Sequence, residues 1–202
     1  MKNFIKCTLT AFLFITAFSA NAQVFSTSGQ VGYSSAKGDA FKDDNGVKQS
    51  SFGLGYEADA LLYLESFDNK LGVGIMYSGN ALFGKNESTA TGIAIYGLNL
   101  YGLKGQYRLL STDKSFSPYG SLGLGLSQFS VPTITINGSE IGGGKGYSLG
   151  MRPEIGLDIN GLLISAQYFV PMKYSVESDA GTFEGSAGTF TISVGYRKYF
   201  DL

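Results

Sequence analysis

Apolar residues alternate with small or polar residues, with a period of two, along most of the chain after residue 22, and no stretch there has the 3.6-residue period of an amphipathic helix. Because successive side chains of a strand point to opposite faces, this pattern predicts strands with one apolar and one polar face. Eight such strands are expected, at about Val24–Ser35, Ser50–Glu65, Leu71–Ala81, Thr91–Leu110, Ser117–Phe129, Tyr147–Ile159, Leu162–Tyr174 and Thr189–Phe200.

The connections between these segments alternate in length. The longer ones are Ala36–Gln49, Leu82–Ala90, Ser130–Gly146 and Ser175–Gly188. The shorter ones are Ser66–Lys70, Ser111–Phe116 and the pair Asn160-Gly161, which is typical of a type I′ hairpin turn. Long loops at one rim and tight turns at the other are the pattern of an up-and-down barrel. We therefore expect an all-β, antiparallel up-and-down barrel of eight strands.

Two segments depart from the simple pattern. In the fourth, Leu98 and Leu100 lie on the polar face and Asn99 lies on the apolar face, and a β-bulge would account for this reversal. After the fifth, Val131–Ile136 alternates well enough to extend strands five and six beyond the membrane and to offer an edge to a partner strand.

The character of the two faces indicates which one points outward. The polar faces are rich in Gly and Ser with few charges, which suits a narrow lumen, whereas an eight-stranded barrel has too little interior for all the bulky apolar side chains. Aromatic residues gather near the strand ends, as they do at membrane interfaces. A soluble, lipocalin-like barrel would alternate too, but with its apolar face inside. The sequence therefore favours a transmembrane barrel, closed because an open sheet edge in lipid leaves backbone groups unpaired.

The first 22 residues have the features of a signal peptide. Lys2 and Lys6 precede the apolar run Leu9–Phe18, which is too short to span a bilayer as a helix. The small residues Ala20 and Ala22 then stand before the expected cleavage site at Gln23. We expect a signal peptide at 1–22 and one barrel domain at 23–202, exported across the inner membrane to the outer membrane of a Gram-negative bacterium. That domain has no cysteine, since the single cysteine is Cys7.

Composition argues against catalysis. The chain has no histidine, which is the commonest side-chain general base and metal ligand. Its formal net charge of −1 gives no indication of nucleic-acid binding. The adjacent Asp43, Asp44 and Asn45 could bind calcium, but their spacing does not match an EF-hand loop, and a solvated turn is the preferred interpretation. We expect no enzyme activity, no cofactor and no bound metal.

Ten charged residues fall on the predicted inner faces. They are Glu57, Asp59, Glu65, Glu154, Asp158, Lys104, Arg108, Arg152, Lys173 and Arg197. Because buried charges are normally paired, these five acids and five bases predict an internal salt-bridge network that closes the lumen. A paired-carboxylate acid–base site and a narrow ion path are the alternatives.

Several segments resemble the small outer-membrane β-barrel families, of the OmpA/OmpX type and the wider outer membrane protein beta-barrel domain group. They are Tyr107-Arg108, the segment Pro118-Tyr119-Gly120 with its following glycines, Arg152–Gly156, and the last strand, Val194–Phe200. In that strand Tyr196 and Phe200 resemble the signal that the barrel-assembly machinery reads, although Asp201 and Leu202 follow the final aromatic residue.

The resemblance covers residues 23–202 and implies a lipid-embedded barrel with a structural or surface-interaction role. Its partners would be outer-membrane lipid, the barrel-assembly machinery and an extracellular ligand or protein at the long loops. A passage for small apolar molecules or ions is the alternative function, and an accessory subunit of an assembly or secretion complex is the third. Outer-membrane enzymes of this architecture depend on a histidine, which this chain lacks.

Overall fold

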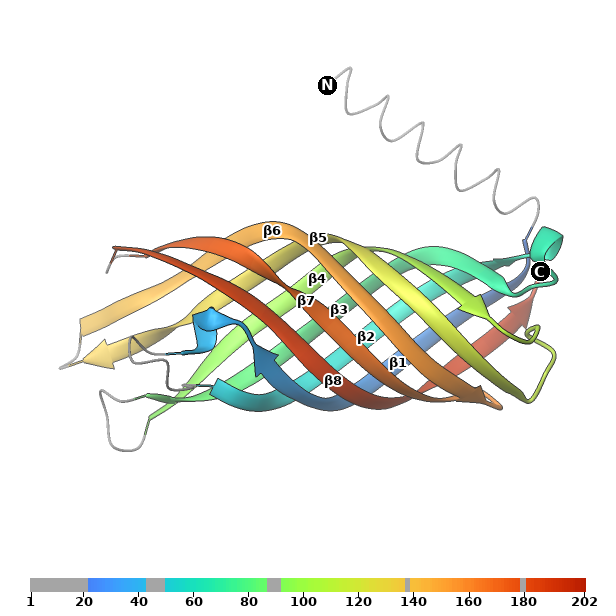
Figure 1. The fold of residues 1–202 in the computed structure, drawn as a ribbon, viewed down its shortest axis with the longest axis horizontal. Helices are drawn as coiled ribbons and strands as arrows, with labels where there is room; N and C mark the ends of the chain where they lie inside the picture. Colours follow the sequence, from blue (N-terminus) through green and yellow to red (C-terminus); the bar gives the residue numbers. More distant parts are fainter. Residues whose placement is uncertain (1–21, 43–49, 87–91, 137–138, 179–180) are drawn as a thin grey trace, which may run out of the picture.

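Eight antiparallel strands form one closed barrel (Figure 1). The computed structural model describes residues 22–42, 50–86, 92–136, 139–178 and 181–202. The strands are β1 (Ala22–Lys37), β2 (Ser50–Leu64), β3 (Leu71–Asn86), β4 (Gly92–Arg108), β5 (Phe116–Ile136), β6 (Ser139–Ile159), β7 (Leu162–Ser178) and β8 (Gly181–Asp201), with short 3₁₀ turns η1 (Asp39–Phe41) and η2 (Glu65–Phe67). The predicted fold class and strand number are confirmed.

Each strand pairs with its neighbours in the chain, and β8 closes the barrel against β1. This last ladder runs from Val24 opposite Asp201 to Lys37 opposite Gly188. The start of β1 and the chain's C-terminal end therefore lie at the same end of the barrel (Figure 1). That end also has the short turns, so we call it periplasmic and the opposite end outer, following the usual arrangement of outer-membrane barrels.

The periplasmic turns follow from their sequences. Asn160 and Gly161 both have positive φ, 52° and 87°, as a type I′ turn requires, so this prediction is confirmed. The backbone N–H of Gly161 also donates to Asp158 Oδ1 at 2.9 Å. In the turn between β2 and β3, Asp68 and Asn69 adopt φ values of 52° and 54°, a conformation that Asp and Asn tolerate better than most residues.

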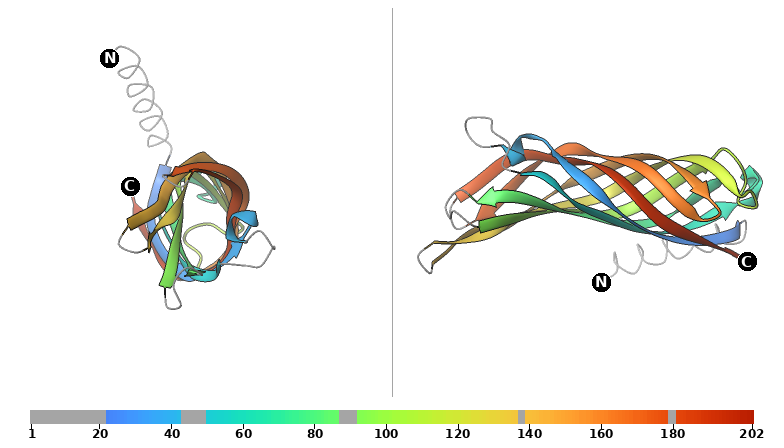
Figure 2. Two further views of the ribbon diagram at one scale, coloured as in Figure 1. Left: turned by 90° about the vertical axis from the view of Figure 1, so that its left-hand side faces the viewer. Right: turned by 90° about the horizontal axis from the view of Figure 1, so that it is seen from below.

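The outer end differs from the prediction. The segments expected as long loops at 130–146 and 175–188 are mostly paired strand, so β5 and β6, and likewise β7 and β8, continue as hairpins (Figures 1 and 2). Val131–Ile136 does extend the sheet, and Ile134 pairs with Ile141. The glycines at 142–146, expected from sequence in the connection Ser130–Gly146, belong to β6, where Gly142 and Gly144 pair with Thr133 and Val131 of β5.

The expected bulge in β4 is absent from this described strand. Its pairing with β3 is in continuous register from Leu71–Tyr107 to Asn86–Gly92. Leu98 and Leu100 are fully buried in the lumen, and Asn99 lies on the outer face. The reversed pattern arises because the outer half of this lumen is apolar, so luminal leucines are favourable there.

An irregularity occurs instead in β7, where the register with β8 shifts between Phe169 and Met172. Below the shift Phe169 is buried in the lumen, whereas above it Tyr174 is buried and Lys173 is exposed. The prediction that Lys173 faces the lumen is therefore wrong, because a one-residue shift exchanges the two faces of a strand.

The outer surface of the barrel is apolar and the periplasmic half of the lumen is polar. Leu149 and Ile155 are 76% and 70% exposed, and the rings of Tyr33 and Phe52 stack near the outer end at 6.5 Å. Among the described residues no helix is long and apolar enough to cross a bilayer. A soluble barrel has its apolar face inside, whereas this barrel has its apolar face outside, as expected for a wall that faces lipid.

Candidate functional site: the filled lumen

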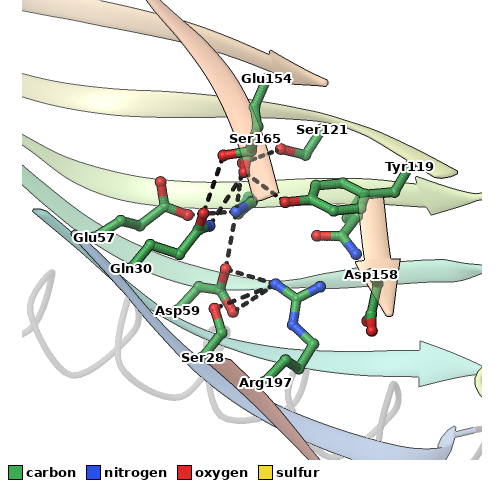
Figure 3. A network of polar contacts seen from close by, with 12 residues as sticks. Ser28, Gln30, Glu57, Asp59, Tyr119, Ser121, Glu154, Asp158, Ser165 and Arg197 are labelled. Carbon is green, nitrogen blue, oxygen red and sulfur yellow. Dashed lines mark hydrogen bonds and ion pairs between the residues drawn. The ribbon is translucent and has the colours of Figure 1, made fainter. Parts of the chain in front are cut away.

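Eight of the ten charged residues predicted for the lumen lie inside it. They are Glu57, Asp59, Lys104, Arg108, Arg152, Glu154, Asp158 and Arg197, and each is at most 6% exposed. They form four acidic and four basic groups from four strands, β2, β4, β6 and β8, and Figure 3 shows part of this charge cluster. The lumen here is charge-balanced, as burial of ionised groups requires.

Lys104 lies at the centre of the charge cluster. Its Nζ is 2.9 Å from Asp59 Oδ2 and 2.8 Å from Glu154 Oε2, and it also pairs with Glu57. On the neighbouring strands the residues opposite Lys104 are Gly74 and Gly123. Its ion-pair partners lie on β2 and β6, which are not neighbours of β4, so the lysine side chain extends across the lumen.

Two arginines complete the middle of the cluster. Arg197 Nη2 donates to both carboxylate oxygens of Asp59, at 3.1 and 2.9 Å, and to Ser28 Oγ at 3.3 Å. Arg152 forms an ion pair with Glu57 and donates to the side-chain oxygen of Gln167. Two basic groups therefore contact Asp59 and two contact Glu57, so each of these carboxylates is compensated from two sides.

Arg108 and Asp158 close the periplasmic end. Arg108 Nη1 lies 2.5 Å from Asp158 Oδ2, and the hydroxyl of Tyr199 contacts both side chains. The guanidinium also lies over the Tyr199 ring, 5.2 Å from its centroid. Sequence reasoning missed Tyr199, although its position two residues from luminal Arg197 places it on the same strand face.

Neutral polar side chains surround the charge cluster. Gln30 Nε2 donates to Glu154 Oε1 at 3.1 Å, and Ser165 and Ser193 donate to Gln30 Oε1 at 3.0 and 2.9 Å. Tyr119 donates to the same Glu154 oxygen at 2.9 Å. In Figure 3 Tyr119, Gln30 and Ser165 surround Glu154. These bonds satisfy carboxylate lone pairs that the basic groups leave unused.

The outer half of the lumen is filled by apolar side chains. Its fully or nearly fully buried members include Leu82, Leu98, Leu100, Phe129, Phe169, Tyr174 and Val176. Phe41, from η1, enters this cluster and is 1% exposed, with edge-on contacts to Tyr96 and Phe129 at centroid distances of 5.8 and 5.7 Å. A loop residue therefore closes the lumen at its outer end. Sequence reasoning missed Phe41, whose signal is a single aromatic residue in a polar loop.

Hydrogen bonds between η1 and β8 hold Phe41 in place. The carboxylate of Asp39 accepts a bond from the backbone N–H of Ser186 at 2.5 Å and another from its hydroxyl. Ser186 Oγ in turn accepts a bond from the backbone N–H of Asp39 at 3.3 Å. The bonds from Ser186 hold the pKa of the exposed Asp39 carboxyl below its ordinary value, because they stabilise the ionised form.

The remaining predicted residues lie outside the lumen. Glu65 is exposed in η2, so the prediction that it faces the lumen is wrong, because strand β2 ends at Leu64. Tyr196 and Phe200 lie on the outer face of β8, 60% and 38% exposed. Of the predicted cleavage-site residues, Ala22 and Gln23 belong to β1, and Ala20 lies outside the described residues.

The candidate calcium ligands Asp43, Asp44 and Asn45 also lie outside the described residues. Within the described ranges, no three acidic or cysteine side chains are placed to hold a metal ion. The three carboxylates that do converge, Glu57, Asp59 and Glu154, surround the ammonium of Lys104. These three carboxylates are therefore compensated by one buried lysine.

The closed eight-stranded sheet, the apolar outer face and the filled lumen define a small transmembrane β-barrel of the outer-membrane type. No family profile and no curated protein matches the sequence. The fold is similar to that of Neisserial surface protein A, with 17% identity, a TM-score of 0.56, and coverage of 87% of this chain and 97% of that one. It is also similar to Ail, the attachment invasion locus protein of Yersinia pestis, solved with the heparin analogue sucrose octasulfate, with 19% identity, a TM-score of 0.53, and coverage of 86% and 99%.

Proposed function

We propose that this chain is a non-conducting outer-membrane barrel that acts through its outer surface and performs no chemistry. The observation that carries the proposal is closure of the lumen at two levels: the charge cluster in the periplasmic half and Phe41 with its aromatic neighbours in the outer half. A barrel filled in this way presents only its rims, its protruding hairpins and its lipid face to partners.

Balanced charge supports a structural role for the charge cluster. Removing one partner of a buried ion pair typically costs about 3–5 kcal/mol, because the other charge is left uncompensated. A conducting path would require water and mobile charge along the axis, yet Lys104 and Arg197 are 2% and 1% exposed. The cluster therefore serves as a plug that fixes barrel shape.

Planar-bilayer recording tests the plug. We expect no steady conductance from the unchanged barrel across a range of voltages and salts. Steady single-channel conductance that disappears when Arg152 or Glu154 is neutralised, as in Arg152→Gln or Glu154→Gln, would contradict the proposal. The matched control is Lys173→Gln, since Lys173 is exposed on the outer wall.

A passage for small apolar molecules is the second candidate. The specific observation in its favour is the apolar character of the outer half of the lumen, from Leu100 to Val176. Uptake of an apolar fluorophore into barrel-containing vesicles separates the two candidates. Uptake that rises above that of empty vesicles, and rises further in Phe41→Ala, would favour the passage.

We further propose that residues 1–22 direct export and that the barrel-assembly machinery reads β8 through Tyr196 and Phe200. Both aromatic side chains face outward near the periplasmic end, where an assembly factor can reach them. The variant Phe200→Ala should slow the appearance of the heat-modifiable folded form, whereas Phe67→Ala, exposed in η2 outside the strands, should not. The structural likeness to Ail, named for attachment, supports an outer-surface interaction at the β5–β6 hairpin.

A further inference from the structure

Three polar side chains form a cluster on the lipid-facing side of β2, β3 and β4. The hydroxyls of Tyr56 and Tyr77 lie 3.0 Å apart, and Tyr77 donates to Asn99 Oδ1 at 3.5 Å. Gly79 pairs with both Tyr56 and Asn99. A Cβ built on it would lie 2.3 Å from the Tyr56 hydroxyl and 2.7 Å from Asn99 Oδ1. The tyrosine ring and the carboxamide therefore close over Gly79, and any larger residue there would require these side chains to shift.

This tyrosine–asparagine cluster lies within the apolar band. Along β4, Asn99 is eight positions from Tyr107, which is opposite Leu71 at the periplasmic end of β3. Its partner Gly79 is four positions from Phe83, which belongs to the aromatic group at the outer end. At the rise of a tilted strand, Asn99 lies roughly 20 Å above the periplasmic aromatic level and roughly 10 Å below the outer one.

The carboxamide of Asn99 is not fully satisfied at that depth. Its side chain is partly exposed on the outer face, and within the described ranges Nδ2 donates to no group. The outward amide of Gln128, directly opposite on β5, differs because its Nε2 donates to the Tyr147 hydroxyl at 3.2 Å. An unpaired amide donor in hydrocarbon is unfavourable by several kcal/mol. A partner with a hydrogen-bond acceptor at the depth of Asn99 would remove this cost.

Small residues occupy outward positions beside Asn99 in the direction of the outer end. Gly97 lies two positions away on β4 and pairs with Ala81 of β3, whereas the outward positions of β5 and β6 carry Leu122, Leu124, Leu126, Leu149, Met151 and Ile155. In the periplasmic direction Asn99 is followed by Tyr101, which is 46% exposed. Small residues allow two membrane-embedded surfaces to approach closely, which strengthens both dispersion contacts and hydrogen bonds between them, so a second surface can approach Asn99 from the outer side of the cluster.

We propose that this side of the barrel binds a second copy of the same chain, with Asn99 at the two-fold axis. A two-fold axis along the membrane normal keeps both copies at one depth, so Asn99 of each copy meets Asn99 of the other. A carboxamide carries both donor and acceptor and is therefore its own complement, with each Nδ2 donating to the opposite Oδ1. A lipid is less well matched, because its polar groups lie at the interface, roughly 10 Å above Asn99.

Cross-linking tests this homodimer. The chain has a single cysteine, Cys7, so a Cys7→Ser background allows one new cysteine at a time. Ala81→Cys should give a covalent dimer with a short bis-maleimide in isolated outer membranes, whereas Val194→Cys, exposed on β8, should give only background. Adding Asn99→Leu should lower the cross-linked fraction about tenfold or more. The variant loses two hydrogen bonds between the copies, each expected to be as strong as those between side chains of neighbouring transmembrane helices. Adding Gln128→Leu should leave the cross-linked fraction unchanged.

Counting photobleaching steps of single labelled barrels provides a second test, which still applies if the cross-linking variants do not fold. The barrel labelled at Lys173→Cys and diluted into lipid vesicles should bleach in two steps, with a dimer fraction that follows protein density and falls with Asn99→Leu. One-step bleaching at every density would overturn the proposal. A monomer that carries a lipid through native mass spectrometry, and loses it in Asn99→Leu, would also overturn it and would assign the cluster to lipid. Heat-modifiable migration of each variant verifies that it is folded.

Discussion

Lys104 on β4 and Glu154 on β6 form an ion pair of 2.8 Å across the strand that separates them. The intervening strand, β5, contributes Gly123, which is opposite Lys104 on one side and Arg152 on the other. A Cβ built on Gly123 would lie 2.3 Å from Met76 Sδ, so the absence of a side chain at this position makes room for Met76 in the lumen. The lumen is therefore stabilised by contacts across the barrel in addition to the ladder between neighbouring strands.

Replacing Lys104 by Met should destabilise the barrel by about 3–5 kcal/mol, because Glu57, Asp59 and Glu154 would lose their shared cation. Urea unfolding in lipid vesicles, followed by the heat-modifiable band, measures the free energy of unfolding. The control Lys173→Met replaces an exposed lysine and should stay within about 0.5 kcal/mol of the unchanged chain. Equal stability of the two variants would show that the charge cluster is not needed for the fold.

Phe41→Ala should loosen η1 without unfolding the barrel. The ring is 1% exposed among Tyr96 and Phe129, and truncating a buried Phe to Ala typically costs about 3–5 kcal/mol. Because this loss falls on one loop, trypsin should cleave after the exposed Lys42 roughly tenfold or more faster. Phe67→Ala, whose ring is half exposed at the other end, is the control. Unchanged cleavage after Lys42 would mean that the aromatic contacts do not hold η1.

The attachment of η1 to β8 should weaken in acid. The Ser186 hydroxyl and backbone N–H lower the pKa of Asp39 from its ordinary 3.8. A carboxyl whose folded-state pKa is lowered stabilises the folded form fully above its unfolded pKa and loses that contribution as pH falls through the lower folded value. The backbone N–H resonance of Ser186 should therefore titrate with a midpoint below 3.8. Asp39→Asn should abolish this titration, and a midpoint at or above 3.8 in the unchanged chain would rule out the bonds.

Two glycines on β4 should respond differently to alanine. A Cβ on Gly102 would lie 2.1 Å from the backbone oxygen of Leu124, whereas a Cβ on Gly105 would have nothing within 4 Å. Gly102→Ala therefore requires β4 and β5 to separate, and we expect it to lower stability by about 1–3 kcal/mol or to prevent folding. Gly105→Ala should be neutral within about 0.5 kcal/mol. The same urea titration compares them, and similar midpoints would contradict the close approach of the two strands.

Much of the lumen could be predicted from sequence because the period of two is a local property. Each of Glu57, Lys104 and Arg197 is placed inside by the parity of its own strand, which needs no knowledge of the rest of the chain. The prediction was wrong for two charged residues, at positions where the alternation of the strand is interrupted. Lys173 follows the register shift of β7, and Glu65 follows the end of β2. A shift and a strand end both depend on pairing with a neighbour, which the local pattern does not contain.

The outer half of the lumen was harder to predict for a different reason. Leu98 and Leu100 are exceptions to the expectation that all residues facing the lumen are polar. The bulge that was proposed to explain them is absent from the described β4. They are luminal because Phe41 and Phe129 supply an apolar environment at that height. This part of the lumen is apolar because the segment that carries Phe41 folds back into the barrel. The alternation of residues along the strands gives no information about such a contact.

Alternation, turn residues and polarity determined, from the sequence alone, an eight-stranded barrel with its apolar face outward and charges inside. Only the tertiary structure decided which charges meet, that Phe41 closes the outer end, and that Tyr77 is the residue that donates a hydrogen bond to Asn99. The physical reason is that closure and stagger of the sheet set the height of each residue relative to strands far away in the chain. Side-chain parity is encoded residue by residue, whereas height in the barrel exists only once the sheet has closed.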